Sequence, residues 1–149
     1  MTTKIGLRPQ VCSIYELEVV TKLVSQSKSH QDYDETDFKN LIVPPLAWRQ
    51  GYTYYIEDDL VGFVSIAFTT PETSEGILDG SKQWSPTDWV SGKEAWLVDL
   101  IAPFGHGAEI AKHVAGALAN QGFRQVYFYR EKGERYVRLS IRPTRASEE

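Results

Sequence analysis

The sequence predicts an α+β domain in which helices lie before and after a mostly antiparallel sheet. Two β-rich runs, 52–56 and 61–69, are separated by the acidic segment 57–59, which is typical of an antiparallel hairpin. An apolar run at 97–101 leads through a proline and two glycines into a helical pattern, as expected for a central strand that feeds a helix. We therefore expect one layered domain.

Length and composition agree with a single domain. The chain has 149 residues, of which 42% are apolar and 12% aromatic, enough to build one core. We predict one domain over 1–149, with flexible ends at 1–12 and 143–149. No apolar run approaches the roughly 20 residues of a membrane span, and the amino terminus lacks the basic-then-apolar pattern of a secretory signal. The expected location is therefore the cytoplasm.

Two helices are predicted before the first hairpin. In residues 14–26 apolar side chains recur at helical spacing, so this segment is expected to form an amphipathic helix. A second helix is predicted from Asp34 or Thr36 to Leu41, because acidic residues crowd its first turn and Pro44-Pro45 follows as an end signal.

The remaining elements follow in order along the chain. A short helix is predicted over 71–78, followed by a polar loop through 79–95. After the central strand and its helix, two β-rich runs at 123–130 and 135–141 predict a second hairpin around Lys132-Gly133.

The segment after the central strand predicts a turn that can bind an anion. Pro103 ends the strand, and Gly105 and Gly107 let the backbone bend tightly before a helix predicted over 108–120. The first amide groups of a helix have no partner within the helix, so they favour an anion above the strand end.

Charge is unevenly distributed, although the net charge is only −4. From residue 122 onward the chain has seven Lys or Arg and four Glu, whereas the first 121 residues have nine basic and sixteen acidic side chains. A basic section on an acidic protein can attract a negatively charged partner, but it can equally be a solvated hairpin. We expect no nucleic acid among the partners.

Two possible sites find little support in the sequence. His106, Glu109 and His113 could face one side of the turn and helix, but their spacing matches no strong metal motif, so solvated side chains are the better interpretation and no metal is expected. The single cysteine, Cys12, excludes an internal disulfide and a Cys-based zinc site. No base is predicted near its thiol, which favours a small buried residue over a nucleophile.

His30 and Asp99 are the stronger candidates for chemistry. His30 lies in a short polar link between two helices, where its ring can face a cleft or simply the solvent. Asp99 interrupts an apolar strand, where a buried carboxylate needs a donor, which could be a backbone cap, an arginine or a histidine, unless it points to a solvated edge. The two together predict a paired site more strongly than either residue alone.

A long and unusual string, "DWVSGKEAWLVDLIAPFG", runs over residues 88–105. It is similar to the signature D-W-x-S-G-x-x-x-W-x-x-D-x-(I/V)-A-P-F-G of a known family, the RTX toxin-activating lysine acyltransferases. "SKSH" at 27–30, "IVPPL" at 42–46 and "LVGFVSIAF" at 60–68 add to the resemblance, which runs from about Ile14 to Phe128.

The resemblance implies a fold, a reaction and site residues. It implies a GNAT-like α+β fold that takes a fatty acyl group from acyl carrier protein and forms an amide on internal lysines of an RTX protoxin. His30 matches the family's catalytic histidine and Asp99 its essential aspartate. Ser27 matches a serine also implicated there, and Asn40 is the nearest counterpart of an asparagine found in the site of some relatives. Relatives also suggest a homodimer.

The sequence departs from the family pattern beside the histidine and in the turn. Lys28-Ser29 and Gln31 replace the usual Pro-Leu and Arg around His30. The turn has Gly105-His106-Gly107, where an acidic residue often follows the first Gly. These departures concern the recognition of partner proteins more than the chemistry.

From these residues we predict a mechanism. His30 accepts a proton from the target lysine, while Asp99 holds the imidazole in one tautomer and stabilises the imidazolium. The phosphopantetheine thioester of acyl carrier protein is expected at the turn formed by Phe104, Gly105, His106, Gly107 and Ala108.

Other interpretations stay open at this point. An acyl-histidine intermediate could replace direct transfer. The chain could instead be a GNAT-type enzyme that uses acyl-CoA on a small amine, or a module that binds a toxin without catalysis.

Overall fold

The computed structural model describes residues 6–130 and 135–143. They contain one sheet with strand order β1-β2-β3-β4-β5-β6, so neighbouring strands in the sheet are also neighbours in sequence. All neighbouring pairs are antiparallel except β4 and β5, which run parallel. The predicted α+β class and the mostly antiparallel sheet are confirmed. The strands are β1 Arg8–Cys12, β2 Gly51–Ile56, β3 Asp59–Thr69, β4 Glu94–Ile101, β5 Gln125–Arg130 and β6 Arg135–Ser140.

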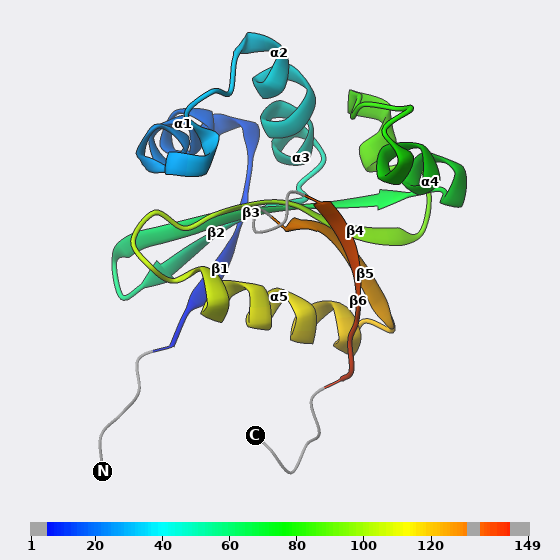
Figure 1. Cartoon of the computed structure of the whole chain (residues 1–149). Helices are drawn as coiled ribbons and strands as arrows, with labels where there is room; N and C mark the ends of the chain where they lie inside the picture. The colour runs from blue at the N-terminus through cyan, green and yellow to red at the C-terminus, as the bar shows by residue number, and fades with distance from the viewer. Residues whose placement is uncertain (1–5, 131–134, 144–149) are drawn as a thin grey trace.

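The helices form a layer on each face of the sheet (Figure 1). One long helix, α5, covers one face and provides the crossover that the parallel strands β4 and β5 require. The shorter helices α1 to α4 cover the other face (Figure 1). The helical elements are η1 Ile14–Glu16, α1 Leu17–Gln26, η2 Lys28–His30, α2 Glu35–Asp37, η3 Phe38–Ile42, α3 Val43–Ala47, α4 Pro71–Asp79, η4 Pro86–Trp89 and α5 Gly107–Asn120.

The central strand β3 is buried on both faces because a helical layer lies on each. Phe63 packs in one apolar cluster with Val20 of α1 and Leu46 of α3. The next residue, Val64, packs in another cluster with Ile110 of α5. Successive side chains of a strand point to opposite faces, so this run of apolar residues serves two cores.

The second predicted helix is longer than expected, and Pro44-Pro45 do not end it. The chain stays helical from Glu35 to Ala47 through a π-helical segment, η3, in which the amide of Val43 donates to the carbonyl of Phe38. The two prolines occupy the first turn of α3, where a backbone donor is not needed. A wider helical turn therefore accommodates residues that normally end a helix.

Two other predictions are wrong in detail. Arg8–Cys12 lies in the end predicted to be flexible, yet it pairs antiparallel with β2 as an edge strand. The predicted polar loop contains the short helix η4, in which Asp88 and Trp89 are buried. Short strands and 3-10 helices depend on distant partners, which local sequence patterns do not reveal.

Both hairpins are confirmed. In the first, β3 begins at Asp59, and Glu57 adopts a positive φ of 55° in the tight turn. In the second, β5 pairs antiparallel with β6. Its expected turn, Lys132-Gly133, and residues 144–149 of the expected flexible end lie outside the described residues.

Candidate active site

His30 is placed by the turn that ends α1. The helix stops where Ser27 adopts an extended backbone, and the chain then turns through η2, with the amide of His30 donating to the carbonyl of Ser27 at 3.2 Å. His30 is only 6% exposed. The interpretation of His30 as a solvent-facing histidine is therefore wrong.

Asp99 lies in β4 opposite Ser65 of β3 and is also 6% exposed. The register between the two strands shifts just after Ser65, and the backbone N–H of Asp99 donates to the Ser65 hydroxyl at 3.0 Å. The alternative of a carboxylate on a solvated edge is excluded by this burial.

The two side chains meet although 69 positions separate them in sequence. Nε2 of His30 is 3.2 Å from Oδ1 of Asp99, and the Tyr33 hydroxyl donates to the same oxygen at 2.6 Å. An ionised carboxylate can only accept, so it favours the tautomer that carries the proton on Nε2. The pair predicted from the sequence is thus assembled, with a tyrosine added.

Tyr33 holds the pair from a position that sequence reasoning missed. Its ring lies edge-on to the His30 ring, with centroids 5.0 Å apart. Burial, and then the nearby Asp99 carboxylate, raise the pKa of Tyr33 well above its ordinary value, so its hydroxyl remains a donor. The sequence did contain an indication of this contact, because Tyr33 follows His30 by three positions and so lies one turn further along the chain.

Two serines approach the other ring nitrogen of His30. Ser27, which is 5% exposed, places Oγ 2.6 Å from Nδ1. Ser29 places Oγ 3.2 Å from Nδ1 and 3.3 Å from Oγ of Ser27. With the proton on Nε2, Nδ1 accepts a hydrogen bond from these hydroxyls.

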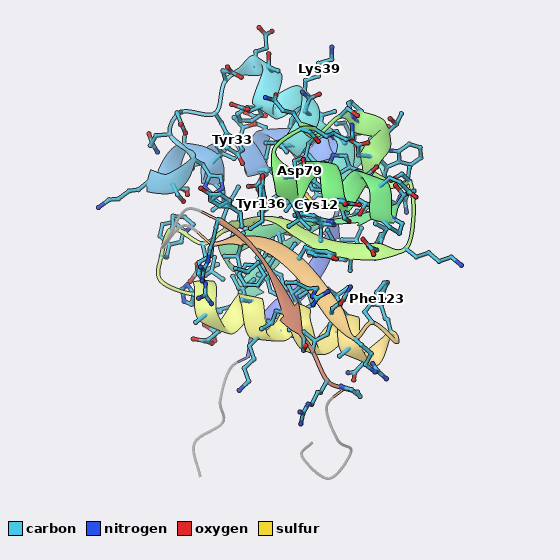
Figure 2. All side chains as sticks on the ribbon, turned by 45° about the vertical axis from the view of Figure 1, so that its right-hand side comes forward. Cys12, Tyr33, Lys39, Asp79, Phe123 and Tyr136 are labelled. Atoms are coloured by element: carbon cyan, nitrogen blue, oxygen red, sulfur yellow. The ribbon has the colours of Figure 1, made fainter. Side chains whose placement is uncertain are left out.

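The pair lines a cavity of about 770 Å³ where β4 and β5 diverge. The two strands pair only at Trp96 with Tyr127 and at Leu97 with Phe128, so the backbone of β4 beyond residue 97 has no partner in β5. Tyr33 from the helical layer and Tyr136 from β6, both labelled in Figure 2, line the same cavity. Its walls are Ser29, His30, Tyr33, Leu41, Trp84, Trp96, Leu97, Val98, Asp99, Leu100, Gly107, Ala108, Ala111, Phe128, Tyr129, Arg130 and Tyr136.

Only part of the predicted anion-binding turn reaches this cavity. Gly107 and Ala108, the first residues of α5, line it. Phe104, Gly105 and His106 are not among its walls, and Phe104 is 52% exposed. Gly105 instead makes the bend, with a positive φ of 95°.

Asn40 does not lie in the cavity wall. It belongs to the π-helical segment η3, and its backbone carbonyl accepts a hydrogen bond from Nε1 of Trp89 at 2.9 Å. The neighbouring Leu41 lines the cavity instead.

The metal and thiol candidates do not line this cavity, namely His106, Glu109, His113 and Cys12. Nδ1 of His113 is 2.8 Å from the Tyr54 hydroxyl, and burial raises the pKa of Tyr54 to about 12, so the hydroxyl is the donor. Across residues 6–130 and 135–143, no three or more His, Cys, Asp or Glu side chains group so that they could hold a metal ion. Burial raises the pKa of the Cys12 thiol to about 12, which keeps it protonated.

The first part of the string 88–105 supports the fold and lies outside the cavity wall. Asp88 accepts from the Ser85 amide at 2.8 Å and pairs with Nζ of Lys82 at 3.0 Å. A Cβ added to Gly92 would lie 2.4 Å from the backbone of Thr69, so only glycine fits there. This first part of the string is therefore structural, whereas Asp99, further along it, contacts His30 and lines the cavity.

Comparisons with known proteins show the family and agree with this fold. A model of the RTX toxin acyltransferase family matches residues 14–141. The chain is 33% identical over 94 residues to the lysine-acyltransferase RtxC of Vibrio cholerae, and the aligned segment covers 61% of this chain and 60% of that protein. It is 27% identical over 112 residues to the protein-lysine myristoyltransferase RtxC of Kingella kingae, with 74% of this chain and 66% of that protein covered.

Among solved structures, the loading GNATL domain of CurA from Lyngbya majuscula superposes with a TM-score of 0.54 at 16% identity, over 83% of this chain and 64% of that chain. This similarity concerns the fold, which is GNAT-like as predicted. The aligned parts cover less than two thirds of the two RtxC proteins. Among the described residues, no helix is both long and apolar enough to cross a bilayer.

Proposed function

This chain belongs to the RTX toxin acyltransferase family, and we propose that it transfers a fatty acyl group from acyl carrier protein to internal lysines of an RTX protoxin. The observation that carries this proposal is the buried His30 and Asp99 pair, at 3.2 Å, in the wall of the cavity between β4 and β5. The names of the relatives support lysine as the acceptor.

The chemistry requires a base because lysine is normally protonated. With an unperturbed pKa of about 10.4, roughly one lysine in a thousand is neutral near pH 7, a handicap of about 4–5 kcal/mol. We propose that His30 takes the proton and that Asp99, facing Nε2, stabilises the imidazolium. The neutral amine then attacks the thioester carbonyl, and the thiol of the carrier leaves.

The donor arm fits the gap between the diverging strands. Beyond Leu97 no β4 residue is paired with β5, so the backbone groups of β4 that do not bond to β3 can bond to the amides of a phosphopantetheine arm. Gly107 and Ala108 begin a helix in the same cavity, which suits the phosphate or the developing oxyanion. The aromatic walls, such as Trp84 and Tyr136, suit an acyl chain.

The β5 and β6 edge suits an acidic carrier protein. Arg130 lines the cavity, and Arg135 of β6, which pairs with Arg130, is exposed. Opposite charge accelerates encounter and orients the partner, so we propose this edge as the docking surface. The reaction is proposed to take place in the cytoplasm, where a carrier thioester and an unsecreted protoxin meet, with a homodimer as the working form.

The test is acyl transfer by the purified chain. A lysine-containing protoxin fragment is incubated with acylated carrier protein or with acyl-CoA, and acylated lysines are identified by mass spectrometry. We expect product with the carrier thioester and none with His30→Ala. If the only product came from acyl-CoA and a small amine, both the proposed donor, acyl carrier protein, and the proposed acceptor, a protoxin lysine, would be wrong. Binding of the toxin with no product from any donor would indicate a binding module without catalysis. Detection of an acyl group on His30 would indicate an acyl-enzyme intermediate in place of direct transfer.

A further inference from the structure

The nitrogen of His30 that can act as a base is contacted by two serine hydroxyls. Asp99 holds Nε2, so the free lone pair is on Nδ1. Nδ1 lies 2.6 Å from the Ser27 hydroxyl and 3.2 Å from the Ser29 hydroxyl. These two serine hydroxyls are the groups that contact Nδ1 among the described residues.

The two serines differ in access to the cavity. Ser27 is 5% exposed and is not among the cavity walls, whereas Ser29 is exposed and lines the cavity. His30 also lines the cavity but is only 6% exposed, so of the two serines Ser29 is the one that an amine in the cavity can reach.

We propose that Ser29 relays the proton of the acceptor amine to His30, an inference that rests on the proposed acyl transfer. An ammonium N–H bond breaks as its proton moves to Oγ of Ser29, and the Ser29 hydroxyl proton moves to Nδ1 of His30. The serine is neutral before and after the step, the ammonium becomes an amine, and the new imidazolium charge faces Asp99 through Nε2. The path can also include Ser27, whose Oγ is 3.3 Å from that of Ser29.

Ser29 lies both in the cavity wall and within 3.2 Å of Nδ1 of His30. Its exposure means that its hydroxyl contributes little to folding, so chemistry is the better reason for its contact with Nδ1.

The experiment compares Ser29→Ala and Ser29→Thr with the wild-type chain in transfer from acylated carrier protein, from pH 6.5 to 9.5. Near pH 7, kcat of Ser29→Ala should be about tenfold lower, since water replaces the hydroxyl poorly. The deficit should shrink as pH rises, because more of the lysine is neutral without a base. Ser29→Thr should restore the rate, and KM for the carrier should not change. The ionisable groups that contact His30, Asp99 and Tyr33, are unchanged in both variants.

Ser25→Ala is the matched control, because Ser25 is an exposed serine near the same turn whose hydroxyl bonds to the Lys22 carbonyl. A wild-type rate for Ser29→Ala across the pH range would overturn the relay, and so would a deficit that is independent of pH. An acyl group found on Ser29 without acceptor would make it a nucleophile and also overturn the relay. No transfer by the wild-type chain would instead contradict the proposed function.

Discussion

Strand β4 has two parts that differ in their pairing with β5. The paired part, residues 94–97, pairs with β5 at Trp96 and Leu97, whereas the open part, residues 98–101, lies beyond the last β5 pair. In the paired part, Trp96 is 1% exposed, stacks on Tyr127 with ring centroids 4.9 Å apart, and donates to the Ser74 hydroxyl at 2.9 Å. In the open part, Asp99 receives its donors from His30 and Tyr33, which lie outside the sheet. One strand thus stabilises the fold at its start and places the proposed catalytic carboxylate beyond its pairing with β5.

The largest expected effect of a substitution is a loss of kcat in the open part of β4. Asp99→Asn should lower kcat of acyl transfer about a thousandfold, because an amide does not stabilise the imidazolium or hold the same tautomer. The free energy of unfolding should change little by comparison, since Asn keeps the size of the side chain and its bond with Tyr33. Kinetics and urea unfolding of the same preparation measure both quantities. An active Asp99→Asn would remove the carboxylate from the mechanism.

The paired part should respond in stability. Trp96→Ala removes a buried ring and its hydrogen bond, so the free energy of unfolding should fall by about 3–5 kcal/mol. Trp48→Ala is the control, because Trp48 is 52% exposed and lies outside β4. Urea denaturation measures the free energy of unfolding of both variants. An equal decrease in the two would contradict the structural role of the paired part.

A smaller effect on the chemistry is expected at Tyr33. Tyr33→Phe removes the hydroxyl that donates to Oδ1 of Asp99 at 2.6 Å but keeps the ring against His30. Because a hydrogen bond to a charged group contributes about 1.5–3 kcal/mol, kcat should fall about tenfold or somewhat more. Tyr15→Phe, at a residue 94% exposed, should have the wild-type rate. A wild-type rate for Tyr33→Phe would show that His30 alone positions Asp99.

The smallest effect is expected at the docking edge, beside the open part of β4. Arg135→Ala should raise KM for acylated carrier protein a few-fold without changing kcat, because exposed charges act on encounter. The difference should shrink in high salt, where exposed charges are screened. Arg8→Ala, on the opposite edge strand β1, serves as the control. Equal changes in both variants would indicate a general charge effect.

Local elements could be predicted because interactions over a few residues decide them. The spacing of apolar residues predicted α1, and Gly122, which adopts a positive φ of 105°, marked the end of α5. The acidic turn and its flanking β-rich runs predicted the hairpin of β2 and β3. Prolines were misleading only where a π-helical turn accommodated them.

The sequence by itself determined which residues could react: a histidine in a polar link, and a carboxylate too costly to bury alone. Only the tertiary structure decided that His30 and Asp99 meet, that Tyr33 joins them, and that β4 and β5 diverge to open a cavity beside them. Helices and turns arise from neighbours in the chain, whereas contacts across 69 positions depend on how two layers pack on one sheet.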